Sequence, residues 1–177
     1  MAHALTAVRL ILIAPIATGF ARPDLVGATA LACLLGLAIA TDIFDGRVAR
    51  RRGTASAAGQ VFDHTTDCMF VTSGLVGAAL VGQVPWMLPP LVVVAFLQYV
   101  LDSYFLHQQK QLRMSVIGRW NGVLYFVPLV ILASAKLMFF VPFESFLRTC
   151  AVLLAYGLVG STLVSIADRA LAPRVRG

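Results

Sequence analysis

Long apolar runs separated by short polar stretches dominate this sequence. The runs cover, in order, about residues 4–20, 25–44, 54–81, 86–106, 116–140 and 143–167. Each is close to the ~20 residues that a helix needs to cross a bilayer. Segments rich in turn formers or charges, such as 82–85 and 107–113, separate them. The pattern predicts an all-α, polytopic membrane protein with six transmembrane helices, folded as a single domain over residues 1–177.

The composition agrees with this prediction. Charged residues make up 12% of the chain and hydrophobic residues 59%, with a mean hydropathy of +0.86, whereas soluble domains contain about 25% charged residues. The first apolar run is too long for a cleavable signal peptide and lacks a basic head. The three cysteines have no paired spacing, so we expect small core residues rather than disulfides or a zinc site.

The distribution of positive charge predicts the topology. A net charge of +6 could indicate nucleic-acid binding, but the basic residues follow the loops, so we expect no nucleic-acid partner. If the basic loop at 47–52 is cytosolic, six helices place both termini there as well. Eleven basic residues then face the cytosol and three face the other side, in agreement with the positive-inside rule. The cytosolic set is Arg9, Arg47, Arg50, Arg51, Arg52, Lys110, Arg113, Arg119, Arg169, Arg174 and Arg176.

Two acidic stripes occur at helical spacing next to each other in the chain. The first consists of Asp42, Asp45, Gly46, Ala49 and Arg50. The second consists of Ser56, Gly59, Asp63 and Asp67. The members of each stripe share one helix face. If the two helices turn these faces toward each other, four carboxylates gather around one cavity.

Four crowded carboxylates require cations or protons, because their mutual repulsion is strong. Oxygen ligands of this kind suit Mg²⁺, Mn²⁺ or Ca²⁺, and two such ions can clamp the entering and leaving oxygens of a phosphoryl transfer. Beside them, Arg50 can bind a phosphate in a forked geometry, and Gly46 leaves room for a base or sugar. The competing hypothesis is a cation transporter or channel that uses the aspartates as its ion site.

The spacing of both stripes resembles the signature of the CDP-alcohol phosphatidyltransferase family, D-x2-D-G-x2-A-R-x8-G-x3-D-x3-D. Every fixed position of that signature is matched between Asp42 and Asp67. The resemblance implies a six-helix membrane enzyme, a homodimer, that transfers a phosphatidyl group from CDP-diacylglycerol to the hydroxyl of a small alcohol and releases CMP. It also implies a bacterial inner membrane, with the site at the cytosolic face and in contact with membrane lipids.

The same resemblance implies roles for the matched residues. Two divalent ions, Mg²⁺ or Mn²⁺, would be bound by Asp42, Asp45, Asp63 and Asp67, and Asp67 would also act as the general base. The donor nucleotide would contact Gly46, Ala49, Arg50, Ser56 and Gly59. The pattern Leu5-Thr6-x-x-Arg9 is similar to the first helix of bacterial members, which makes Thr6 and Arg9 further donor contacts. The alternative for Arg9 is a side chain that extends to the membrane interface.

The acceptor is left open between glycerol 3-phosphate and another polar alcohol. A phosphorylated acceptor needs cations, and the candidates are Lys110, Arg113, Arg119 and Arg169. The run 115–120 loosely resembles the Ser…Gly-Lys stretch of phosphatidylglycerophosphate synthases. Those enzymes usually continue with Lys-Thr, where this chain has Asn121-Gly122, and usually have Pro and Lys where it has His64 and Cys68. We expect His64 to lie beside the acidic stripe rather than on it.

Overall fold

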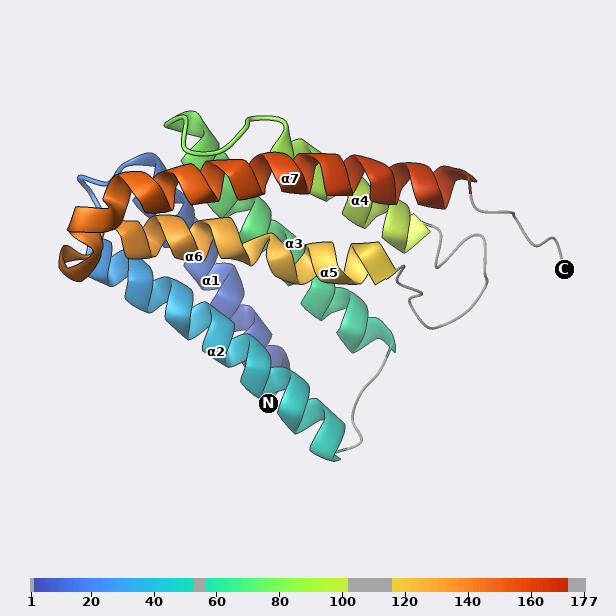
Figure 1. The fold of residues 1–177 in the computed structure, drawn as a ribbon. Helices are drawn as coiled ribbons and strands as arrows, with labels where there is room; N and C mark the ends of the chain where they lie inside the picture. The colour runs from blue at the N-terminus through green and yellow to red at the C-terminus, as the bar shows by residue number, and fades with distance from the viewer. Residues whose placement is uncertain (1, 53–56, 102–115, 172–177) are drawn as a thin grey trace, which may run out of the picture.

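The computed structural model of the chain describes residues 2–52, 57–101 and 116–171, and this part is entirely helices and turns (Figure 1). The helices are α1 (Ala2–Ala21), α2 (Ala28–Arg52), α3 (Ala57–Leu80), α4 (Leu88–Leu101), α5 (Val116–Leu124), α6 (Phe126–Ala135) and α7 (Glu144–Leu171), with a 3-10 helix η2 (Met138–Phe143) before α7. The all-α prediction is therefore confirmed.

Two segments of the described chain are long and apolar enough to cross a membrane, Ile117–Ala135 and Met138–Leu171. Shorter apolar helices occupy Ala7–Ala21, Ala28–Phe44 and Leu88–Leu101. Large apolar side chains such as Ile11 and Leu153 are exposed on the outer faces of the helices, which fits a lipid environment. Six complete transmembrane helices remain a prediction.

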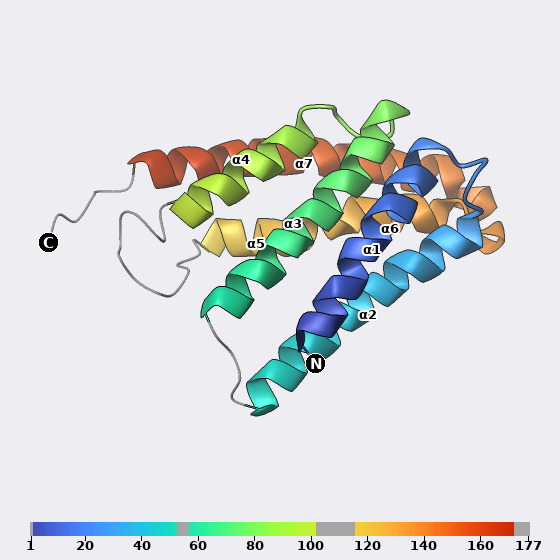
Figure 2. The same cartoon turned by 180° about the vertical axis from the view of Figure 1, so that it is seen from behind.

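The helices form two groups that meet at an angle (Figures 1 and 2). In one group α1 lies between α2 and α3 and contacts both extensively. In the other, α7 runs along α4, α5 and α6. The approach of α3 to α1 is very close, because a Cβ at Gly77 would lie 2.4 Å from the carbonyl oxygen of Ala17. Only a glycine permits this contact.

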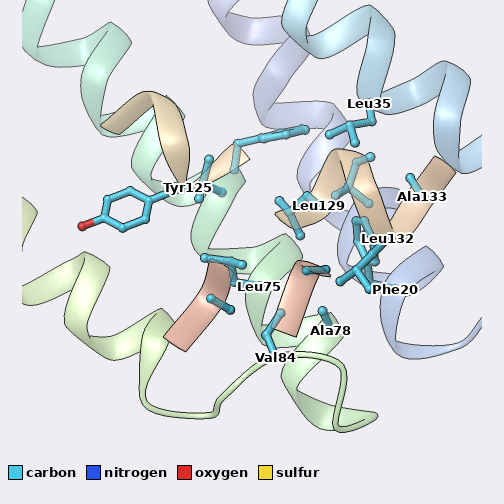
Figure 3. Close-up of a cluster of buried hydrophobic side chains, with 14 of the residues drawn as sticks. Phe20, Leu35, Leu75, Ala78, Val84, Tyr125, Leu129, Leu132 and Ala133 are labelled. Atoms are coloured by element: carbon cyan, nitrogen blue, oxygen red, sulfur yellow. The ribbon is translucent and has the colours of Figure 1, made fainter. Parts of the chain in front are cut away.

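Buried apolar side chains join the two groups (Figure 3). Phe20 of α1, Leu35 of α2 and Leu75 of α3 meet Leu129 and Leu132 of α6, and all five are buried. Because the cluster contains side chains from α1, α2, α3 and α6, it orients the first three helices against α6. The acidic residues lie farther along, in the C-terminal half of α2 and the N-terminal half of α3, so the same packing positions them.

One prediction about the loops is wrong. The sequence supports two overlapping expectations for 47–52, a basic loop and a helix face that extends to Arg50, and the loop is wrong because α2 continues as a helix to Arg52. Arginine is a good helix former, and the segment contains no helix breaker before Gly53. The predicted turn at 82–85 is confirmed, since Gly82 has a φ of +71° and donates its backbone N–H to the carbonyl of Ala79 at 3.0 Å. The predicted polar segment 107–113 lies outside the described residues.

The break in the fifth apolar run has a clear cause. The run contains Asn121-Gly122 and Pro128, and the helix is interrupted at Tyr125, between α5 and α6. The ring of Pro128 conflicts with the carbonyl of the residue four positions earlier, which is Leu124, the last residue of α5. The helix is therefore interrupted just before the proline, although Tyr125 keeps right-handed helical angles (φ −63°, ψ −23°), and the interruption lies beside the cavity described below.

Candidate active site

The side chain of Arg9 forms the centre of an acidic cluster built by three helices. Its Nη1 lies 2.9 Å from Oδ1 of Asp42 on α2, and its Nη2 lies 2.5 Å from Oδ1 of Asp63 on α3. Nη1 also donates to Oδ1 of Asp67 on α3. The Arg9 side chain is 1% exposed, so the alternative of a side chain that extends to the membrane interface is wrong.

Sequence spacing explains how these groups meet. Asp63 and Asp67 are four residues apart in α3 and therefore share a helix face. Asp42 comes from α2, and α1 lies between the two helices and directs Arg9 at both. The carboxylates keep contact with the outside, because Asp42, Asp63 and Asp67 are 42%, 32% and 23% exposed. The structure thus brings three of the four predicted aspartates to one place.

A cavity of about 860 Å³ opens beside this cluster. Asp42, Asp63 and Asp67 line it, together with Arg119 of α5 and Arg169 of α7. The rest of the wall is largely apolar and includes Val92, Phe96, Val123, Phe126, Val127 and Val130. One space therefore holds carboxylates, guanidinium groups and an apolar surface, which suits a ligand with charged and lipid parts.

Two aromatic residues at the cavity wall complete the site. His64, which helical spacing places off the acidic stripe, lines the cavity as well. Its ring meets the ring of Tyr99 on α4 nearly edge-on, with centroids 6.3 Å apart. Arg169 lies over the same tyrosine, with Cζ 5.3 Å from the ring centroid. Tyr99 was not predicted from the sequence. The one indication is that its hydroxyl and the neighbouring Gln98 amide are polar groups within an otherwise apolar run.

The structure does not describe the side chains of several predicted site residues. Asp45, Gly46, Ala49 and Arg50 lie on the helical backbone of α2, and Thr6 lies on that of α1, but their side chains are outside the described part. Ser56, Lys110 and Arg113 lie outside the described residues altogether. Gly59 is described and lies on α3, one turn before Asp63.

The described residues fit a divalent cation. One ligand atom from each of Asp63, His64 and Asp67 lies within 4.8 Å of the others. Three carboxylates surround a single guanidinium, so these four side chains carry an excess of negative charge. Carboxylate oxygens are the ligands that hard divalent ions prefer. The donor set therefore suits Mg²⁺ or Mn²⁺.

These features define an all-helical membrane protein with a carboxylate cluster that suits divalent cations at the wall of a mixed polar and apolar cavity. The sequence pattern of the CDP-alcohol phosphatidyltransferases matches residues 1–168. The chain belongs to this family, whose members are metal-dependent enzymes.

Curated relatives are found in two strains of Mycobacterium tuberculosis. Each is described as a "probable phosphatidylglycerophosphate synthase" and is 27% identical to this chain over 141 residues. The match covers 76% of this chain and 61% of each relative, so the chain spans about three fifths of their length. No solved structure matches the chain.

Proposed function

We propose that this chain transfers a phosphatidyl group from CDP-diacylglycerol to the hydroxyl of a small alcohol and releases CMP. The observation that carries the proposal is the convergence of Asp42 from α2 with Asp63 and Asp67 from α3 at the cavity wall. Family membership favours this activity over a cation transporter. The positive-inside pattern supports a site on the cytosolic side of the membrane, within reach of soluble alcohols.

The proposed chemistry is an exchange of one P–O bond for another. The acceptor oxygen bonds to the lipid-side phosphorus, the bond from that phosphorus to the bridging oxygen breaks, and CMP leaves with the electron pair. Asp67 would take the proton from the acceptor hydroxyl, since its carboxylate lines the cavity. Asp42, Asp45, Asp63 and Asp67 would hold two divalent ions. When bound, those ions supply positive charge for the transferring phosphoryl group.

The donor nucleotide and its pyrophosphate would bind along the same helices. Arg9 is the best supported contact, because its forked guanidinium already lies among the carboxylates and matches phosphate geometry. The other proposed donor contacts are Thr6, Gly46, Ala49, Arg50, Ser56 and Gly59. The apolar part of the cavity wall offers a surface for the lipid portion of the donor.

The acceptor is proposed to be anionic. Arg119 and Arg169 line the cavity that also contains the aspartates, and a guanidinium binds phosphate well. Lys110 and Arg113 are further proposed contacts. Because the relatives are described as probable phosphatidylglycerophosphate synthases, glycerol 3-phosphate is the first acceptor to test. A homodimer is also proposed, on the family resemblance alone.

A CMP-release assay tests the proposal. The purified protein would receive CDP-diacylglycerol with glycerol 3-phosphate, inositol phosphate, inositol, serine or choline, with Mg²⁺, Mn²⁺ or a chelator. We expect CMP release with an anionic acceptor, and only when the metal is present. Arg119→Ala and Arg169→Ala should raise the acceptor KM. Arg148→Ala is the matched control, because Arg148 pairs with Glu144 in the first turns of α7, far from the cavity. No CMP release with any acceptor would contradict the proposal.

A further inference from the structure

We infer that Tyr99 is a positioning residue that fixes the guanidinium of Arg169 at the cavity wall and thereby favours anionic acceptors. The inference rests on the proposed function, because it assigns Arg169 to acceptor binding. Tyr99 lies in the last turn of α4, is 5% exposed, and lines the cavity together with Arg169.

The contact between the two residues is a cation–π pair. Cζ of Arg169 lies 5.3 Å from the centroid of the Tyr99 ring, inside the ~6 Å range over which the ring face attracts a cation. The attraction is stronger where water is excluded, and the tyrosine is buried. An arginine held in one place before the ligand arrives loses less conformational freedom when it binds.

The ring of Tyr99 is itself held from two further directions. His64 of α3 meets it nearly edge-on, and Phe96 of α4 lies with its centroid 6.2 Å away. His64 directly follows Asp63, one of the clustered carboxylates. The tyrosine therefore connects the acidic helix α3 with the basic end of α7.

A hydrogen bond next to Tyr99 also links α4 to α7. Nε2 of Gln98, the neighbour of Tyr99, donates to the backbone carbonyl of Ile166 at 3.1 Å. Ile166 lies three residues before Arg169 in α7. The bond thus limits how far α7 can slide along α4, and it keeps the guanidinium level with the tyrosine ring. Both α3, which carries Asp63 and Asp67, and α7, which carries Arg169, pack against α4.

This arrangement selects for charge in the acceptor. An anionic group bound by Arg169 would place the rest of the acceptor in the space between that arginine and Asp67, both of which line the cavity. A neutral alcohol can accept a hydrogen bond from the guanidinium but forms no ion pair with it, so it binds there more weakly. The loss of Tyr99 should therefore weaken the binding of anionic acceptors and leave donor binding intact.

The test measures anion binding separately from turnover. The Tm would be measured at increasing concentrations of glycerol 3-phosphate or inorganic phosphate, with Mg²⁺ and CDP present. Where CMP is released, the acceptor KM would be measured as well. Tyr99→Leu should weaken anion binding about three- to thirty-fold, the range expected for loss of a cation–π pair. Tyr99→Phe keeps the ring face and should bind anions within about twofold of the unaltered protein.

A double variant decides whether Tyr99 acts through Arg169. Tyr99→Leu combined with Arg169→Ala should bind anions no more weakly than Arg169→Ala alone, because the tyrosine then has nothing to position. Tyr156→Leu, a matched change at an exposed site on α7, is the control. If Tyr99→Leu does not fold, Tyr99→Met, which also removes the ring face, takes its place in the test.

The outcomes separate the two proposals. The role of Tyr99 would be overturned if the unaltered protein bound no anion, or if Tyr99→Leu left anion binding unchanged. It would also be overturned if the fold-losses of anion affinity in Tyr99→Leu and Arg169→Ala multiplied in the double variant. Absence of CMP release, with anion binding and its dependence on Tyr99 intact, would instead overturn the proposed function.

Discussion

Nη1 of Arg9 lies 2.9 Å from Oδ1 of Asp42, and this pair ties the first helix to the acidic end of the second. The same guanidinium reaches Asp63 and Asp67 on the third helix. A buried arginine therefore supplies positive charge to carboxylates that are proposed to bind metal. Because Arg9 contacts the same oxygens that are proposed to bind divalent ions, the arginine and the metal should be energetically coupled.

We predict that Arg9→Ala makes the protein depend more strongly on divalent metal for its stability. Removal of one partner from a buried ion pair typically costs about 3–5 kcal/mol, and the partial exposure of the aspartates should reduce this. Without Arg9 the carboxylates repel one another, and Mg²⁺ relieves that repulsion. Thermal unfolding should therefore show a larger Mg²⁺-induced rise in Tm for Arg9→Ala than for the unaltered protein.

The control for this prediction is Arg22→Ala, since Arg22 is exposed and follows α1 at its other end. That substitution should leave the response to Mg²⁺ unchanged. Equal Mg²⁺-induced shifts in Arg9→Ala and in the unaltered protein would show that the arginine and the metal do not share ligands.

Asp67→Asn should abolish most turnover and retain part of the metal and donor binding. The amide keeps the shape of the side chain and one oxygen, but it cannot accept the acceptor's proton. General-base groups contribute about 10²–10⁴-fold to rate, so CMP release should fall by that order. Asp24→Asn makes the same chemical change at an exposed position in the turn between α1 and α2 and should not affect the rate. Full activity in Asp67→Asn would remove this residue as the base.

Gly77→Ala should destabilise the protein through the contact between α1 and α3. The added Cβ would lie 2.4 Å from the carbonyl oxygen of Ala17, and a backbone atom cannot move aside as a side chain can. Overpacking of this kind costs about 1–3 kcal/mol. A lower Tm and a weaker interaction with CDP should follow, because α1 carries Arg9.

Gly157→Ala on α7 is the matched control, since a Cβ at that position meets nothing within 4 Å. There the substitution should be neutral or should stabilise the helix by up to about 1 kcal/mol. A Tm for Gly77→Ala equal to that of the control would mean that α1 and α3 are farther apart than the structure indicates.

Much of the acidic cluster could be predicted from sequence, and the reason is local geometry. The spacing of Asp63 and Asp67 fixes their common helix face without any knowledge of tertiary structure. The role of Arg9 as their partner could not be derived in this way, because it depends on α1 lying between α2 and α3. Tyr99 is a single aromatic residue in an apolar run, and only the packing of α4 against α3 and α7 reveals its neighbours.

The errors in the helix boundaries have a similar origin. Charge density suggested a loop at 47–52, yet a helix that leaves the apolar layer can continue as a helix when no residue breaks it. The apolar run at 116–140 is divided at Tyr125, and that position follows from the backward clash of Pro128. Such details depend on the backbone rather than on the composition of the segment.

Thermal stabilisation by CDP, measured with and without divalent metal, tests most directly whether the clustered aspartates hold ions that bind a CDP-linked lipid. A ligand that binds only the folded protein raises stability by about 2.7 kcal/mol at one hundred times its Kd. We predict that CDP raises the Tm with Mg²⁺ or Mn²⁺, that a chelator removes the effect, and that Asp63→Asn removes it while Asp24→Asn does not. If CDP stabilised the protein equally in chelator and in Mg²⁺, or if the effect survived Asp63→Asn unchanged, the aspartates would not hold ions that bind the CDP group.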